Sequence, residues 1–316
     1  MKKPANSPKD APGLRPLVEN SNRTRRVGTT STGRLSLTGA PRAAANVDRL
    51  IRLALTEDIG AGDITSRLVV PAETCAEARL VARSPGVLCG IRICARVFKT
   101  VDAKVRFRIL QPDGTRFRRG TELARIDGHA RSLLAAERTA LNFLQRLSGV
   151  ATLTRHYVDA VRGTGAVVLD TRKTIPAWRA LDKYAVRCGG GRNHRHGLYD
   201  MIIIKDNHIR ACGSITAALK RCRQSRHLVE VETQTLADVR EALAAGARWI
   251  MLDNMPLAEI RRAVLLVAGR CRIEASGGIT LANVRRVART GVDFISIGAL
   301  THSAPAADIA LDFLPR

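Results

Sequence analysis

The chain has 316 residues, 45% of them hydrophobic and 3% aromatic, and its 52 Lys and Arg against 28 Asp and Glu give a formal net charge of +24. The aliphatic content can fill a sizeable core, which excludes a collagen-like or fully disordered protein. No apolar run reaches the roughly 18 residues of a membrane-spanning helix. The seven cysteines include no Cys-x-x-Cys pair, which argues against structural zinc and for reduced thiols in a cytoplasm.

The positive charge is compatible with a nucleic acid, an anionic membrane surface or an anionic small-molecule substrate. Residues 1–46 hold nine Lys and Arg against two acids, and their Pro-, Ser-, Thr-, Asn- and Gly-rich composition predicts a basic disordered tail. The rest shows no zinc finger, RNA-recognition motif or aromatic stacking platform, so we expect no specific nucleic-acid binding. A basic nucleic-acid-binding protein nevertheless stays open as an alternative of a different class.

The first periodic region combines helices with a sheet. A helical pattern begins at Val47 and ends at a turn cluster over 58–63. Four short apolar runs separated by Gly and Pro then predict strands of an antiparallel or mixed sheet, at 78–82, 86–90, 105–110 and 122–126. Residues 130–147 contain neither Pro nor Gly, and their leucine stripe predicts a helix.

After residue 154, short aliphatic or β-branched runs alternate with helical segments. The runs are 166–169, 201–204, 228–231, 249–252, 273–275 and 294–297, and the clearest helices are 214–223, 236–245, 257–267 and 281–290. From the third run on, the runs begin about every 20 to 25 residues, which is the repeat of strand–helix units in a parallel sheet, whether doubly wound or closed into a barrel. Nearly every run ends in polar or glycine residues, and barrel enzymes build their sites at such strand ends, so the pattern favours a barrel.

Cationic side chains gather after the first two of these strands. They are Arg172, Lys173, His194, Arg195 and Lys205. Arg pairs with carboxylates and phosphates in bidentate geometry, and Lys supplies a point charge. Glu232 and Asp253 are the only evident acids nearby, so we expect the five groups to lack internal compensation and to bind an anion.

Acids and glycines end the later strands. Glu230 and Glu232 point to the same side of one strand, and Asp253 ends the next. Two carboxylates beside an anion site suit a Mg²⁺ that keeps several waters and bridges to substrate phosphates. The loops after the last two strands, where barrels bind phosphate, hold Ser276, Gly277, Gly278, Gly298 and Ala299.

Four segments in combination resemble a known family: ERTALN at 137–142, DTRKTIP at 170–176, GGGRNHR at 189–195 and KDNH at 205–208. From about residue 47 to the C-terminus the sequence is similar to the quinolinate phosphoribosyltransferases, also called nicotinate-nucleotide pyrophosphorylases. The one departure is Pro176-Ala177-Trp178, where the family more often has Pro-Gly-Leu. This change would place Trp178 in a loop near the mouth of the barrel.

The resemblance implies an N-terminal α/β sandwich and an incomplete, TIM-like α/β barrel of fewer than eight strands. The expected organisation is the tail (1–46), the sandwich (47–152) and the barrel (153–316), whose last residues can return to the sandwich. The implied reaction transfers a phosphoribosyl group from phosphoribosyl pyrophosphate to quinolinate with decarboxylation. It gives nicotinate mononucleotide, CO₂ and pyrophosphate in de novo NAD biosynthesis. A related barrel pyrophosphorylase acting on another pyridine or small acid is the alternative.

The resemblance also implies roles by position. Quinolinate's carboxylates would be held by Arg172, His194, Arg195 and Lys205, beside Thr171, and by Arg138 of a neighbouring subunit. Phosphoribosyl pyrophosphate and its Mg²⁺ would be held by Lys173, Glu232 and Asp253, the metal through substrate and water. The 5′-phosphate would rest on Ser276, Gly277, Gly278, Gly298 and Ala299. The catalytic residues would be Arg172, Lys173, Lys205, Glu232 and Asp253, in a homodimer or higher homo-oligomer with shared active sites.

Overall fold

The computed structural model of the protein describes residues 41–315, and for 41–45 it describes the backbone alone. The basic tail expected over 1–46 therefore lies almost wholly outside the described residues. Helix α1 (Pro41–Ile59) begins before the expected end of that tail and covers the helical pattern that starts at Val47. Within the described part of the chain, no helix is both long and apolar enough to cross a membrane.

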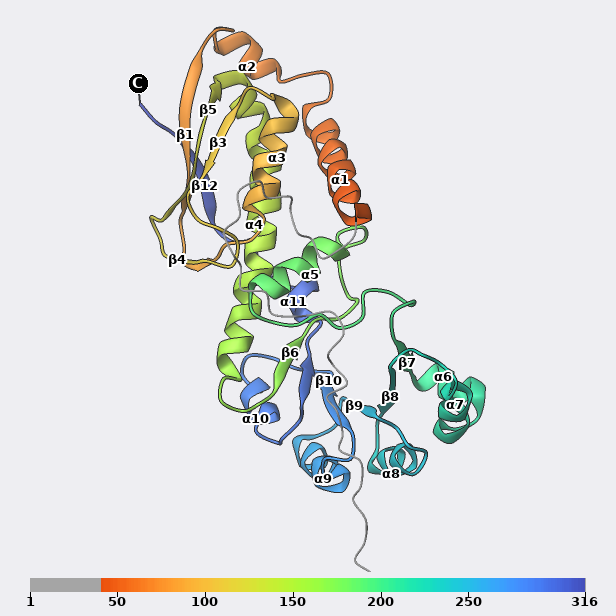
Figure 1. The fold of residues 1–316 in the computed structure, drawn as a ribbon. Coiled ribbons are helices and arrows are strands. Elements are labelled where there is room, and N and C mark those ends of the chain that lie inside the picture. The colour runs from red at the N-terminus through yellow and green to blue at the C-terminus, as the bar shows by residue number, and fades with distance from the viewer. Residues whose placement is uncertain (1–40, 316) are drawn as a thin grey trace, which may run out of the picture. The chain divides into compact units, whose positions relative to one another are not determined.

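The N-terminal half of the chain forms most of a four-stranded antiparallel sheet, whose order is β12–β1–β5–β3 (Figure 1). Its strands are β1 (Cys75–Ala82), β3 (Arg106–Ile109), β5 (Glu122–His129) and β12 (Ile309–Phe313). Alternation along β1 buries Ala78 and Leu80 and exposes Glu77 and Arg79, as expected for a sheet covered on one face. Strand β12 comes from the end of the chain and pairs with β1.

Two features of this region differ from the expected strands. Residues 86–90 form only β2 (Gly86–Val87), which pairs with β4 (Arg116–Phe117) in a separate two-stranded sheet. Helices α2 (Ile64–Val69) and α3 (Ile91–Val101) were not predicted. The β-branched residues of α3 have low helix propensity, but packing of Ile91, Cys94 and Val97 in the core overrides it.

Helix α4 (Ala130–Ala160) is much longer than the expected 130–147, and the expected domain boundary after residue 152 falls inside it. It passes Gly149 without interruption, although glycine is a poor helix former. A side chain there would clash, because a Cβ atom on Gly149 would lie 2.0 Å from the carbonyl oxygen of Pro305. Gly149 therefore permits close packing between α4 and the segment that leads to β12.

The C-terminal half holds a six-stranded parallel sheet in the order β6–β11–β10–β9–β8–β7. The strands are β6 (Val167–Leu169), β7 (Ile202–Ile204), β8 (Val229–Thr233), β9 (Trp249–Asp253), β10 (Arg272–Ser276) and β11 (Phe294–Ser296). This is the strand order of a barrel interrupted between β6 and β7. The expected incomplete α/β barrel with fewer than eight strands is confirmed, and the doubly wound alternative is wrong.

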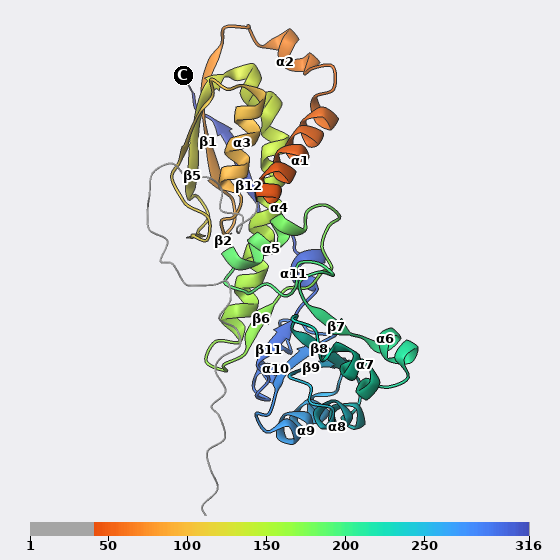
Figure 2. The same ribbon diagram turned by 45° about the vertical axis from the view of Figure 1, so that its right-hand side comes forward.

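Helices follow the strands of this sheet (Figure 2). Four of them were expected: α7 (Ile215–Cys222), α8 (Leu236–Ala244), α9 (Leu257–Val267) and the shorter α10 (Val284–Ala288). Three others were not: α5 (Arg179–Cys188), α6 (Asp206–Cys212) and α11 (Ala299–His302). These three lie just beyond the carboxyl ends of β6, β7 and β11, within or beside the segments that carry the candidate site residues.

Candidate functional site

Because the six strands are parallel, their carboxyl ends lie at one end of the sheet. Asp253 and Ser276 are paired at the ends of β9 and β10. Lys205 directly follows β7, and Glu232 is the penultimate residue of β8. The sheet thus brings the residues expected at strand ends to a common mouth.

Arg172 and Arg195 each hold an unsatisfied donor at this mouth. The Nε atom of each guanidinium is buried and has no hydrogen-bond partner. Neither side chain forms a salt bridge with any residue of 41–315, although Arg195 donates one hydrogen bond to the carbonyl of Met201 at 3.0 Å. Burial, and after it the charge of Arg172, lower the pKa of Arg195. Two neighbouring cations with unsatisfied buried donors are suited to an anion with two charged groups.

His194, by contrast, is fully engaged by the protein. Its Nε2 donates to Glu230 Oε2 at 3.1 Å and lies 3.5 Å from Glu274 Oε2. Its Nδ1 accepts the backbone N–H of Arg195 at 2.7 Å. Both carboxylates are completely buried. The expectation that only two acids lie near the cations is therefore wrong, because it overlooked the barrel interior below the mouth.

This buried cluster resembles a metal site in composition but does not fit one. One ligand atom from each of His194, Glu230 and Glu274 lies within 4.8 Å of the others. Since Nδ1 accepts a hydrogen bond, the ring proton is on Nε2, which leaves no lone pair there for a metal. Burial and the charge of Glu274 raise the pKa of Glu230 to about 7. The cluster is better described as a hydrogen bond between His194 and Glu230 that orients the imidazole ring, with Glu274 3.5 Å from the same nitrogen.

Lys205 is also compensated, by a salt bridge from its Nζ to Glu232 Oε2. On the next strand, Asp253 Oδ2 accepts a hydrogen bond from Asn254 Nδ2 at 2.9 Å. The expectation of five uncompensated cations is thus wrong for His194 and Lys205. Three cations remain without an acid partner in the described part of the chain: Arg172, Lys173 and Arg195.

Lys173 is exposed and is held through its backbone. Its N–H donates to Thr171 Oγ1 at 3.0 Å, and its carbonyl accepts from Thr301 Oγ1 at 2.7 Å. Its aliphatic stem lies on Gly298, where a Cβ atom would be 3.0 Å from Lys173 Cδ. The loops after β6 and β11 therefore meet at Lys173. The Thr171 hydroxyl stabilises the loop after β6 by accepting the Lys173 N–H.

The glycines after β10 adopt conformations that other residues disfavour. Gly277 has φ +87° and Gly278 has φ +61°. A Cβ atom on Gly277 would lie 2.2 Å from Asn254 Oδ1, so this loop packs tightly on the loop after β9. The backbone N–H groups of Gly277, Gly278, Gly298 and Ala299 have no acceptor among residues 41–315. Free amides of this kind can cradle a phosphate.

Sequence reasoning missed a buried ion pair beside the mouth. Lys183 on α5 and Asp170 at the end of β6 are both fully buried and paired with each other. Burial raises the pKa of Asp170 and lowers that of Lys183. The sequence marks Asp170 as a polar residue that ends a strand, whereas Lys183 carries no signal, since a lysine on an amphipathic helix usually faces solvent.

Two other expected residues lie away from this group of contacts. Arg138 is exposed on α4, and its side chain has no hydrogen bond or salt bridge to any described residue. Trp178 stacks on Phe143 of α4, with ring centroids 4.7 Å apart and planes inclined by 9°. Trp178 lies in the turn before α5, as expected, and its ring packs against α4.

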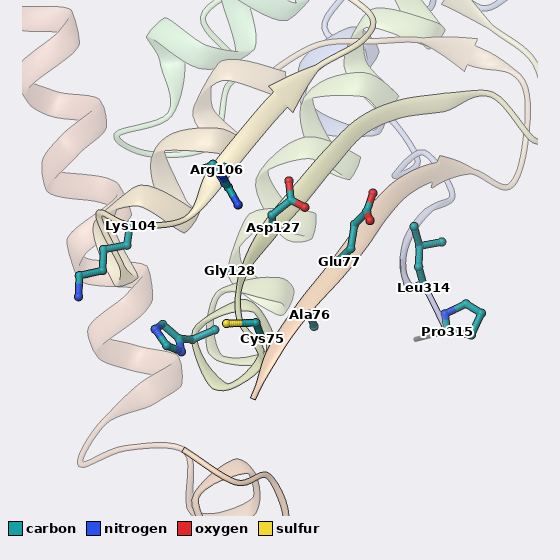
Figure 3. A pocket seen from close by; sticks show the side chains of 10 residues that line it. Cys75, Ala76, Glu77, Lys104, Arg106, Asp127, Gly128, Leu314 and Pro315 are labelled. Atoms are coloured by element: carbon teal, nitrogen blue, oxygen red, sulfur yellow. The ribbon is translucent and has the colours of Figure 1, made fainter. Parts of the chain in front are cut away.

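The N-terminal sheet carries a separate hollow (Figure 3). It is lined by Cys75, Ala76, Glu77, Lys104, Arg106, Asp127, Gly128, His129, Leu314 and Pro315. Glu77 and Asp127 project from the adjacent strands β1 and β5. None of the expected site residues lines this hollow.

The sequence matches two family models, the N-terminal domain of quinolinate phosphoribosyl transferase over residues 63–148 and its C-terminal domain over 150–312. It is 46% identical over 267 residues to the probable nicotinate-nucleotide pyrophosphorylase of Bacillus subtilis, a match covering 84% of this chain and 92% of that protein. It is 43% identical over 284 residues to the chloroplastic enzyme of Oryza sativa, covering 83% and 76%. The structure of the Francisella tularensis nicotinate-nucleotide pyrophosphorylase superposes with a TM-score of 0.82 at 39% identity, covering 88% and 99%. The chain belongs to the quinolinate phosphoribosyltransferase family.

Proposed function

We propose that the mouth of this barrel binds quinolinate beside phosphoribosyl pyrophosphate and carries out the reaction of its family. The chain transfers the phosphoribosyl group to quinolinate with decarboxylation, which gives nicotinate mononucleotide in NAD biosynthesis. The observation that carries the assignment is the pair of unsatisfied guanidinium groups of Arg172 and Arg195. Quinolinate has two adjacent carboxylates, which match two neighbouring cations.

The contacts of the other mouth residues support the following roles in this proposal. Arg172 and Arg195 bind the carboxylates of quinolinate. Lys205 also binds a carboxylate, after its Nζ releases Glu232. His194 fixes the backbone of Arg195 and takes no carboxylate itself. Lys173 faces the pyrophosphate, and the free amides after β10 and β11 take the 5′-phosphate.

The acids at the mouth fit Mg²⁺ bound through substrate and water. Glu232 and Asp253 lie at the carboxyl ends of neighbouring strands, and within residues 41–315 a single carboxylate oxygen of each accepts a hydrogen bond. Mg²⁺ keeps several waters and needs only one or two protein carboxylates when phosphates supply the other ligands. When bound, the metal would neutralise charge on the leaving pyrophosphate.

The residues of the site act mainly by positioning the two substrates and by stabilising charge, and less by transferring protons. The pyridine nitrogen bonds to C1 of the ribose as the C1–O bond to pyrophosphate breaks, so the residues must hold the nitrogen in line and stabilise the leaving oxygens. The ring nitrogen is then cationic. The carboxylate beside it leaves as CO₂, its bonding pair stays on the ring carbon, and that carbon takes a proton from water.

The working unit is proposed to be a homodimer or higher homo-oligomer in which Arg138 enters the mouth of a neighbouring chain. Two observations support this: Arg138 is exposed without a partner in the described region, and α2 exposes Ile64, Leu68 and Val69 at 73%, 88% and 71%. Contiguous exposed apolar residues of this kind mark contact surfaces. The division into 47–152 and 153–316 remains a proposal.

A cytoplasmic location is proposed as well, because the buried thiols of Cys89 and Cys94 are free, as in a reducing compartment.

Pyrophosphate release tests the assignment. With phosphoribosyl pyrophosphate and Mg²⁺, we expect release with quinolinate, an equal amount of CO₂, and none with nicotinate. Release that requires nicotinate, or that occurs equally with both acids, would support the alternative of a related pyrophosphorylase. Omitting Mg²⁺ and adding a chelator should abolish release, which checks the metal separately from the acid substrate.

A further inference from the structure

The opening between β6 and β7 is partly filled by the segment that carries His194 and Arg195. Arg192 donates its N–H to the carbonyl of Val168 at 2.9 Å and accepts the N–H of Asp170 at 3.2 Å. This is a parallel bridge between Leu169 and Arg192. The segment thus pairs with the edge of β6 that no strand of residues 41–315 covers.

The buried pair Asp170 and Lys183 completes the attachment. Lys183 Nζ donates to the carbonyl of His194 at 2.9 Å and is paired with Asp170 Oδ1. Asp170 Oδ1 accepts the N–H of His194 at 2.9 Å, and Asp170 Oδ2 accepts from Asn193 Nδ2. Both backbone polar groups of His194 are therefore held by this one pair.

The same pair joins the two pieces of chain that carry the unsatisfied guanidinium groups. Arg172 comes two residues after Asp170, and Arg195 comes one residue after His194. We infer that Asp170 and Lys183 are positioning residues, which fix the spacing between Arg172 and Arg195 so that the two cations match the two carboxylates of quinolinate. The inference rests on the function proposed for the mouth.

Stability alone does not account for this arrangement. A fully buried ion pair loses the hydration of both charges, and replacing such a pair by uncharged residues of similar volume is often neutral or stabilising. Removing only one partner is costly, because it leaves the other charge buried and alone. A neutral Asn–Met pair would keep an acceptor for the His194 N–H but would lose the donor to the His194 carbonyl and the charge that holds the pair together.

The test uses the full chain with Asp170→Asn and Lys183→Met combined, so that no unpaired charge is left. We expect a melting temperature close to that of the wild type, a quinolinate KM raised about tenfold or more, and a KM for phosphoribosyl pyrophosphate within about twofold. The matched control combines Asp48→Asn with Arg96→Met, which neutralises a partly buried pair in the N-terminal half. Neither KM should change in the control.

An unchanged quinolinate KM in the folded double variant would overturn the inference, and so would an equal rise in both KM values, which indicates general loosening. If the double variant does not fold, Asn193→Ala carries the test, because it removes only the donor to Asp170 Oδ2 and to the Lys183 carbonyl. It should raise the quinolinate KM alone, and no rise would overturn the inference. Failure of the wild type to use quinolinate would instead refute the proposed function.

Discussion

Among single residues, Arg172 shows how an unsatisfied donor indicates the charge of a substrate. Its buried Nε has no partner, and its charge acts on a second arginine in the same condition, Arg195. Two such cations repel each other unless an anion lies between them. The DTRKTIP segment at 170–176 predicts Arg172 at a strand end. In the structure, Arg172 forms no salt bridge with an acid of residues 41–315.

Replacing Arg172 by alanine should therefore weaken quinolinate binding and leave phosphoribosyl pyrophosphate binding intact. A charge-assisted hydrogen bond contributes roughly 1.5–3 kcal/mol, so we expect the quinolinate Kd to rise at least about tenfold. Titration calorimetry with each substrate separately measures both affinities. Arg262→Ala, on the exposed face of α9, is the control. A loss of quinolinate affinity below about threefold, or an equal loss for both ligands, would contradict the assignment.

At the scale of elements, the site depends on how closely its loops approach one another. Gly298 has φ −66°, which any residue can adopt, so its lack of a side chain matters for space alone. A Cβ atom there would lie 3.0 Å from Lys173 Cδ and 3.2 Å from His302 Nε2. Both distances are tighter than ordinary contacts, so Lys173 would have to move.

We expect Gly298→Ala to raise the KM for phosphoribosyl pyrophosphate by about threefold or more, because small displacements at reacting groups are costly. The quinolinate KM should stay unchanged. Steady-state kinetics of Gly298→Ala, Lys173→Ala and the double variant form a thermodynamic cycle. If the effect passes through Lys173, the glycine substitution adds nothing once Lys173 is gone. Full additivity of the two substitutions would show that Gly298 acts independently of Lys173.

On the scale of the whole molecule, the placement of Arg138 has the largest consequence. It lies on α4, whose first turns cover the N-terminal sheet, whereas Lys205 follows β7 of the barrel. Arg138 has no partner within residues 41–315. A second copy of the chain that inserts Arg138 into the mouth would supply the missing partner.

Complementation tests this arrangement. Arg138→Ala and Lys205→Ala should each be inactive alone, but a mixed dimer would contain one site lacking both residues and one site lacking neither. Mixing the two variants should therefore restore up to about half of the wild-type activity per mixed dimer. Each variant mixed with itself is the control, and subunit exchange is followed by mass spectrometry of differently tagged chains. Absence of recovery after confirmed exchange would place Arg138 in the site of its own chain.

By itself, the sequence determined the strand–helix succession of the barrel and the residues at its mouth. The six buried runs and the polar ends that follow them are local patterns, since they depend on neighbouring residues alone. The motifs around Arg172, Arg195 and Lys205 were enough to indicate the family. Local pattern was weaker in the N-terminal half, where helix α3 is stabilised by contacts with α4 that no short window contains.

Only the tertiary structure decided which charges at the mouth are compensated. The partners of His194 are Glu230 and Glu274, which come from strands 36 and 80 positions further along the chain. The sequence predicts a surface position for Lys183, yet its side chain is buried against Asp170. There it donates a hydrogen bond to the His194 carbonyl, in the segment between β6 and β7. Burial and pairing of charges depend on residues distant in the chain, because the closing sheet brings them together and excludes water from between them.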